Sequence, residues 1–198
     1  MNFLAHAHLS GENDDLLFGN FIADAVKGNG MLNYDGDVRL GIRLHRRIDT
    51  FTDKHDIVRK SVGRVRNSFG KYSGIVIDIF YDHFLAVAWS DFHKETLPFF
   101  AKRVYQILLN RYQILPDRTK RMLPYLIGQD WLVGYSNFEG LTQVFYGMDR
   151  RTDFQSGMRT AVDDLRKNYN ELQSDFSMFY PELQNHVDFL IKEYLFLD

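Results

Sequence analysis

Two pairs of polar residues stand four positions apart in this sequence: His45 with Asp49, and Asp78 with Asp82. On a helix, each pair projects from one face about one turn apart, a spacing that suits two ligands of one metal ion. Asp24 is a further carboxylate among apolar neighbours, in the segment NFIADAV. Burying an unpaired carboxylate costs several kcal/mol, so each acid needs a metal, a cation or a strong hydrogen-bond donor. A hydrogen bond from His45 to Asp49, and an ion pair between Asp78 and an arginine, are the structural alternatives.

The histidines gather in the same part of the chain. Six of the seven lie within the first 93 residues, and the sequence contains no cysteine. The lack of cysteine excludes a disulfide scaffold, a zinc–thiolate cluster and a thiol nucleophile, so any metal must be held by histidine, aspartate or glutamate. His6 and His8 alternate in an apolar stretch, where one would be a ligand and the other a packing residue. His83 follows Asp82 and points about 100° away from it on a helix.

The elements that carry these residues are expected to be helices. Gly and Pro are few, 14 and 4 of 198 residues, which is lean for a sheet protein with many tight turns. Apolar residues recur at intervals of three and four. The pattern predicts helices from the caps at 13–15 to Gly28 and over about 37–51, 54–69, 74–89, 97–115, 117–128 and 138–146, then two long helices that Pro181 separates near residue 179. We expect one all-α domain over residues 1–198, with the motif-bearing part in 1–90 and a helical remainder in 91–198.

Charge is segregated along the chain. The net charge is only −2, from 24 basic and 26 acidic residues, which argues against wholesale capture of nucleic acid. Residues 36–71 nevertheless carry ten basic and four acidic side chains, whereas the part from residue 153 onward is acidic. No apolar run approaches the roughly 18–20 residues of a membrane span, and the N-terminus lacks the basic region of a signal peptide. We expect a soluble, cytoplasmic protein with one basic face and no membrane partner.

Four sequence blocks, in this order and spacing, resemble the acyl carrier protein phosphodiesterase (holo-acyl carrier protein hydrolase) family: MNFLAHAHLS, GNFIADAVKG, GIRLHRRIDTFTDKH and DIFYDHFLAVAW. This family is regarded as a divergent branch of the HD-domain metal-dependent phosphohydrolases. The resemblance covers residues 1–89 strongly. It implies an HD-like helical fold, a divalent metal, typically Mn²⁺, and hydrolysis of the phosphodiester that joins 4′-phosphopantetheine to the serine of holo-acyl carrier protein. Two departures are the Asp82-His83 pair, which reverses the HD order, and Asp56, where the family motif FTDxHP has proline.

The resemblance also implies site residues. The matching polar positions are His6, Asp24, His45, Arg46, Asp49, Asp82 and His83, with Asp78 as a further candidate. The predicted metal ligands are Asp24, His45, Asp49, Asp78 and Asp82. Such a carboxylate-rich set suits Mn²⁺ or Mg²⁺, and Fe²⁺ if more histidine takes part. Arg46 or Arg47 would neutralise the nonbridging phosphate oxygens, with a solvated helix face as the alternative for either, and His83 or His6 would protonate the serine leaving group.

The basic segment suits an acidic protein substrate. Acyl carrier proteins are small and strongly acidic, so a positive surface would steer and orient them. The residues predicted to form this surface are Arg39, Arg43, Arg47, Arg59, Lys60, Arg64 and Arg66. Two other functions are compatible with the sequence: an HD-like hydrolase of a nucleotide or another small phosphoester, and a non-enzymatic helical binding protein whose buried acids only form ion pairs.

Overall fold

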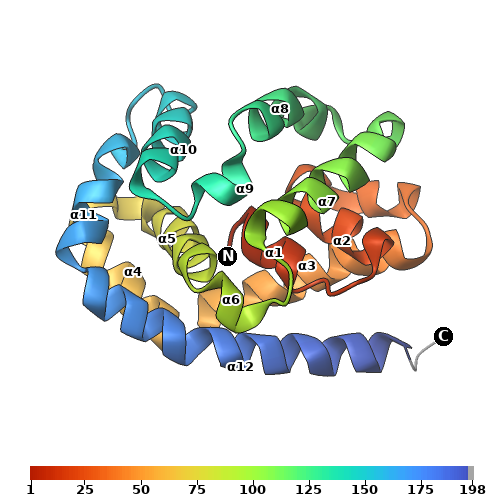
Figure 1. Ribbon diagram of the computed structural model, residues 1–198, viewed down its shortest axis with the longest axis horizontal. Helices are drawn as coiled ribbons and strands as arrows, with labels where there is room; N and C mark the ends of the chain where they lie inside the picture. The colour runs from red at the N-terminus through yellow and green to blue at the C-terminus, as the bar shows by residue number, and fades with distance from the viewer. Residues whose placement is uncertain (196–198) are drawn as a thin grey trace.

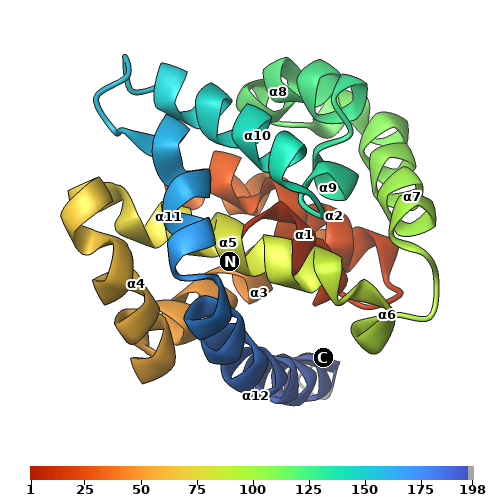
Figure 2. The same cartoon turned by 60° about the vertical axis from the view of Figure 1, so that its left-hand side comes forward.

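The computed structural model describes residues 1–195, which form helices joined by turns (Figures 1 and 2). No β-strand occurs among these residues, so the predicted all-α class is confirmed. None of the described helices is long and apolar enough to cross a membrane. The α-helices are α1 (Phe3–His8), α2 (Asp14–Ile22), α3 (Gly36–Lys54), α4 (Asp56–Phe69), α5 (Ser73–Val87), α6 (Trp89–Phe92), α7 (Leu97–Asn110), α8 (Asp117–Gly128), α9 (Trp131–Gly134), α10 (Phe138–Arg150), α11 (Ala161–Lys167) and α12 (Tyr169–Leu195). Short 3-10 turns are η1 (Ala23–Ala25), η2 (Gly28–Asn33), η3 (Gly70–Tyr72), η4 (Tyr112–Ile114) and η5 (Met158–Thr160).

Helix α5 runs through the middle of the bundle (Figure 2). Eleven of its fifteen residues are buried, and it packs against α1, α4 and α12. A helix covered on most sides is apolar around its circumference rather than along one stripe, which is why its sequence also resembles a buried strand. Buried apolar side chains from every described α-helix join α5 in one continuous core. The polar residues of α5 are therefore held in fixed surroundings.

Two glycines let α2 and α3 approach each other closely. A Cβ atom added to Gly19 would collide with the carbonyl group of Val38, and one added to Gly41 would collide with that of Leu16. Only glycine permits this backbone contact. The contact places the end of α2 against the middle of α3, which carries His45.

Helix α12 differs from the prediction. Pro181 was expected to separate two helices near residue 179, but it lies inside one helix of 27 residues, Tyr169–Leu195. A proline inside a helix costs about 3 kcal/mol because it removes one hydrogen bond and crowds the preceding turn. Pro181 faces solvent, while its neighbours Phe179, Tyr180 and Leu183 are fully buried. Their packing against the rest of the bundle outweighs the cost, so the helix continues.

Candidate metal centre

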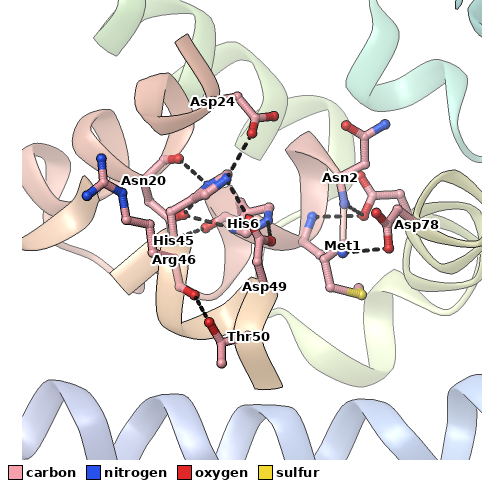
Figure 3. A network of polar contacts seen from close by, with 12 residues as sticks. Met1, Asn2, His6, Asn20, Asp24, His45, Arg46, Asp49, Thr50 and Asp78 are labelled. Atoms are coloured by element: carbon pink, nitrogen blue, oxygen red, sulfur yellow. Dashed lines mark hydrogen bonds and ion pairs between the residues drawn. The ribbon is translucent and has the colours of Figure 1, made fainter. Parts of the chain in front are cut away.

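Side chains from α1 and α3 converge at one point, shown in Figure 3. Nε2 of His6 lies 3.2 Å from Oδ1 of Asp49, and Nε2 of His45 lies 3.2 Å from Oδ2 of the same carboxylate. The two imidazole rings stack with their centroids 3.9 Å apart. One ligand atom from each of the three residues lies within 4.8 Å of the other two. We call His6, His45 and Asp49 the His/Asp cluster.

Asn20, at the end of α2, fixes the orientation of both rings. Nδ1 of His6 lies 2.9 Å from Oδ1 of Asn20, and Nδ1 of His45 lies 2.9 Å from the Asn20 carbonyl oxygen. The amide nitrogen of Asn20 donates to the His6 carbonyl oxygen and to Ser10 Oγ, which identifies Oδ1 as the acceptor. Because both oxygens can only accept, each Nδ1 carries a hydrogen, and each Nε2 is directed toward Asp49.

Asp24 approaches the cluster from the turn η1. Its Oδ1 lies 3.3 Å from Nε2 of His45, and 64% of its side chain is exposed. The hydrogen bond from His45 lowers the pKa of Asp24 below its ordinary value. Asp24 is therefore a negatively charged group that reaches His45 from the solvent side.

The two histidines of the cluster have opposite protonation preferences. Burial, and to a smaller extent the neighbouring His45, lower the pKa of His6 to about 4. Burial also disfavours charge on His45, but the carboxylates of Asp24 and Asp49 outweigh it and raise its pKa to about 9. Burial raises the pKa of Asp49, but the adjacent imidazoles of His45 and His6 outweigh that effect and hold it below the usual range. At neutral pH the metal-free cluster thus holds a neutral His6, whose buried Nε2 makes no hydrogen bond, beside a charged His45.

A polar cavity of about 330 Å³ opens beside the cluster. Its size falls within the range of small-ligand sites. The cavity is lined by His45, Asp49, Asp24, Asp53, Asp78, Arg118, Met1, Asn2, Ile75 and Met148. A ligand in this cavity would meet the cluster directly.

The two acids of α5 are engaged elsewhere. Asp82 is fully buried and accepts hydrogen bonds from the backbone N–H groups of Asn2, Leu4 and Ala5, at 3.2, 2.8 and 3.3 Å. It thus caps the N-terminus of α1, although burial still raises its pKa to about 7. Asp78 lines the cavity, where its Oδ1 lies 2.8 Å from the Met1 ammonium group. Both residues hold the segment that carries His6, and the structure brings neither into the His/Asp cluster.

Three further predicted residues contact other parts of the molecule. His83 is buried, with Nδ1 2.7 Å from the Tyr135 carbonyl oxygen and Nε2 3.2 Å from the Tyr169 hydroxyl. Arg46 points away from Asp49 (Figure 3) and donates to the Val26 carbonyl oxygen and the Met31 sulfur, both at 3.4 Å. Arg47 is exposed on α3 and lines a different surface hollow, together with His186. Catalytic roles for His83 and Arg46 stay predictions.

His8 is the packing residue of the alternating pair. Its Nδ1 lies 2.8 Å from the Tyr180 hydroxyl and its Nε2 lies 3.2 Å from the Phe92 carbonyl oxygen. Both ring nitrogens therefore have hydrogen-bond partners within the fold, whereas Nε2 of His6 has none among the described residues.

The predicted carrier-binding residues are distributed over α3 and α4. Arg39 is held by Asp35 and the Tyr34 carbonyl oxygen, while Lys60 and Arg64 both pair with the buried Asp175 of α12. Arg59 and Arg66 line a second hollow, of about 420 Å³, which shares Asp53 and Asp78 with the cavity of the cluster. Arg43 is exposed on α3. A carrier-binding role for these residues stays a prediction.

The donor set of the cluster fits a divalent cation. Two imidazoles and a carboxylate converge, both Nδ1 atoms are fixed by hydrogen bonds, and Nε2 of His6 is buried without one. Sequence reasoning included His45, Asp49 and Asp24 among the ligands but assigned His6 to proton transfer, and it missed Asn20. The available signal was the position of Asn20, four residues before Asp24 in an apolar segment.

Comparison with known proteins places the chain in a family. The model of the family described as "Acyl carrier protein phosphodiesterase" matches residues 1–183. Proteins of that name from Photorhabdus laumondii and Escherichia coli are 33% and 35% identical over 95% and 92% of this chain, which correspond to 96% and 95% of theirs. One from Yersinia enterocolitica is 31% identical over 93% of this chain and 96% of its own. No solved structure matches. The chain belongs to the acyl carrier protein phosphodiesterase family.

Proposed function

We propose that this chain is a metal-dependent hydrolase that removes 4′-phosphopantetheine from the serine of holo-acyl carrier protein. Its family membership supports the reaction class and the carrier-protein substrate. The observation that carries the proposal is the convergence of two imidazole Nε2 atoms on Asp49, beside a polar cavity that also receives Asp24. A purely structural ion pair does not need two histidines, a shared carboxylate and an adjoining cavity.

The proposed metal ligands are His6, His45, Asp49 and Asp24. Two imidazoles with two carboxylates suit Mn²⁺, which we propose as the natural metal, and also Fe²⁺ or Mg²⁺. A divalent cation bound there would supply Lewis acidity, which polarises a phosphoryl oxygen and lowers the pKa of water. This proposal adds His6 to the predicted ligands and removes Asp78 and Asp82, whose carboxylates hold the Met1 ammonium group and the N-terminus of α1.

The protein itself orients the metal ligands, keeps His6 neutral and offers positive charge to the substrate. Asn20 holds both rings in one tautomer, so the two Nε2 atoms are already directed at the ligand position before anything binds. Burial of His6 keeps its ring neutral at physiological pH, which preserves the lone pair of Nε2 for coordination. The hollow lined by Arg59 and Arg66 adjoins the cavity and offers positive charge to an acidic carrier.

The test is the mass of holo-acyl carrier protein after incubation with the purified protein and Mn²⁺. We expect a loss equal to 4′-phosphopantetheine and the appearance of the free phosphopantetheine. EDTA-treated protein should leave the carrier unchanged, and added Mn²⁺ should restore the reaction. An unchanged carrier in the presence of folded, metal-loaded protein would overturn the proposal, provided that another family member converts the same sample.

A panel of small phosphodiesters distinguishes the alternative substrate. If the protein hydrolyses nucleotides or other small phosphoesters faster than holo-carrier, the metal centre is retained but the carrier is not the substrate. If the protein binds no stoichiometric metal and hydrolyses nothing, the acids serve only as structural ion pairs.

A further inference from the structure

Two arginines from the second half of the chain lie at the edge of the candidate metal centre. Arg118 stands in the first turn of α8, and Arg151 directly follows α10. Both elements lie on the same side of the bundle in Figures 1 and 2. Arg118 lines the cavity of about 330 Å³ together with His45 and Asp49. Arg118 and Arg151 together line a smaller adjoining hollow, which also contacts Asp24.

Neither guanidinium has a carboxylate partner within the described part of the chain. No acidic oxygen lies within 4.0 Å of a side-chain nitrogen of Arg118 or Arg151 among the ion pairs of residues 1–195. The contact of Arg151 is with the sulfur of Met148, at 3.6 Å, which is a weak acceptor. By contrast, Arg103 of α7 holds Glu12 and Asp14, and Arg111 holds Asp15. Carboxylates thus neutralise Arg103 and Arg111 but, within residues 1–195, neither Arg118 nor Arg151.

The two positive charges also act on each other. Burial lowers the pKa of Arg151, and the positive charge of Arg118 lowers it further. Two like charges in one hollow, neither of them in an ion pair with a described residue, repel each other in the free protein, and a bound anion relieves the repulsion. A guanidinium offers a planar fork of N–H donors that matches the oxygens of a phosphoryl group.

We propose that Arg118 and Arg151 form an anion subsite for the phosphoryl group of the substrate. The identity of that anion rests on the proposed function. Arg118 lines the cavity together with His45 and Asp49, and Arg151 joins Arg118 in the adjoining hollow beside Asp24. A phosphoryl group held by Arg118 would therefore lie next to the metal ligands. This assigns to Arg118 of α8 and to Arg151 at the end of α10 the charge neutralisation that the sequence analysis placed at Arg46 or Arg47. It also gives the second half of the chain a direct part in the chemistry.

The test measures binding of inorganic phosphate to EDTA-treated protein, without reference to hydrolysis. Phosphate is titrated while the side-chain N–H signals of arginine are followed by ¹H–¹⁵N NMR. We expect the signals of Arg118 and Arg151 to shift, and Arg118→Ala or Arg151→Ala to weaken phosphate binding about tenfold or more, since each removes a charge-assisted hydrogen bond. Arg118→Lys should weaken it less, because it keeps the charge but loses the fork.

Arg121→Ala is the matched control. Arg121 is exposed on the same helix, three residues beyond Arg118, and it does not line the cavity. It should leave both phosphate binding and hydrolysis of holo-carrier unchanged, whereas Arg118→Ala should lower kcat/KM by about tenfold or more.

Equal phosphate affinity of the wild type, Arg118→Ala and Arg151→Ala would overturn the subsite. If hydrolysis of holo-carrier persists in that case, the proposed function stands and only the subsite fails. If the two variants lose phosphate binding but the wild type hydrolyses no phosphodiester, the subsite stands and the proposed function fails.

Discussion

Helices α3 and α5 each carry a pair of polar residues four positions apart, and the structure uses the two pairs differently. His45 and Asp49 of α3 lie beside an open polar cavity, within reach of His6 and Asp24. Asp78 and Asp82 of α5 are engaged with the Met1 ammonium group and with the N-terminus of α1. The same spacing therefore supports a candidate metal centre in one helix and an internal brace in the other.

The difference comes from what packs against each helix. Helix α3 borders solvent on one side, so the side chain of Asp49 stays 41% exposed and can exchange its protein partners for a ligand. Helix α5 is central, and Asp82 is fully buried against three backbone N–H groups that need an acceptor. A spacing of four residues places two side chains on one face, but the neighbouring elements decide whether that face meets a ligand or another helix.

The largest expected effect is on the α3 pair. Asp49→Ala should lower kcat/KM for holo-carrier by about a thousandfold, or about 4 kcal/mol, because the carboxylate that both Nε2 atoms face is lost and the metal is no longer held. The half-exposed position predicts little change in stability. Bound Mn²⁺, measured by mass spectrometry of the metal, and carrier mass check this. Thr50→Ala, at the next and exposed position of α3, serves as the control.

Substitution in the α5 pair should lower the stability of the protein rather than its metal binding. Asp82→Ala should lower the free energy of unfolding by about 3 kcal/mol, because it leaves three backbone N–H groups at the start of α1, those of Asn2, Leu4 and Ala5, without their acceptor. Asp82→Asn keeps one acceptor oxygen, so its free energy of unfolding should fall by less than that of Asp82→Ala. Urea unfolding of the metal-free variants measures both. If Asp82→Ala kept its stability but lost Mn²⁺ affinity, Asp82 would be a ligand and the contrast with α3 would fail.

Asn20 combines the two roles, since it lies within the fold as Asp82 does, but its hydrogen bonds orient the proposed metal ligands. Asn20→Ala should weaken Mn²⁺ binding about 10- to 100-fold, because Nδ1 of His6 loses its acceptor and its ring can turn, while Nδ1 of His45 keeps only the backbone carbonyl oxygen of residue 20. Asn13→Ala is the matched control: Asn13 caps the same helix, so its loss costs about 1 kcal/mol of stability. Equal Mn²⁺ affinities of the two variants would show that Asn20 affects the site only through stability.

Local pattern predicted most of the helices. The pattern predicted α3, α4, α5 and α8 with nearly their observed ends, because each begins near a cap or breaker; α3, α4 and α8 also carry a regular apolar stripe, and α5 a long apolar run. Pro181 was misleading because its cost is local, whereas the burial of Phe179 and Tyr180 that offsets it depends on the distant helices against which α12 packs.

The same limit applies to the site. The spacing of His45 and Asp49 was visible because both lie on one helix. The pairing of Asp82 with α1 spans nearly 80 residues, and that of Arg118 with the cavity depends on a helix far along the chain, so no spacing rule could find either. The close contact of Gly19 with α3, which brings Asn20 to the histidines, likewise appears only in three dimensions.

The smallest expected effect is the dependence of stability on pH that His45 of the α3 pair should cause. In metal-free protein the pKa of His45 is raised from 6.5 to about 9, so its contribution to stability is fully present below pH 6.5 and is lost as the pH rises through about 9. We expect the free energy of unfolding to fall by about 1 kcal/mol over this range through His45, because its partner carboxylates are partly exposed and solvent screens them. Urea unfolding of EDTA-treated wild type and His45→Gln across this range measures the difference.

That comparison isolates His45 from two other groups. The Met1 ammonium group, whose pKa is also raised, loses its contribution in the same direction, but it is present in both proteins and cancels. The pKa of Asp82 is raised from 3.8 to about 7, so its proton-linked contribution to stability falls as the pH rises from about 4 to 7, below the range in which His45 titrates. A difference between the two proteins that stays constant from pH 6.5 to 9 would mean that the α3 pair carries no proton-linked charge. Loading the wild type with Mn²⁺ should abolish the dependence, because a bound cation replaces the proton on His45.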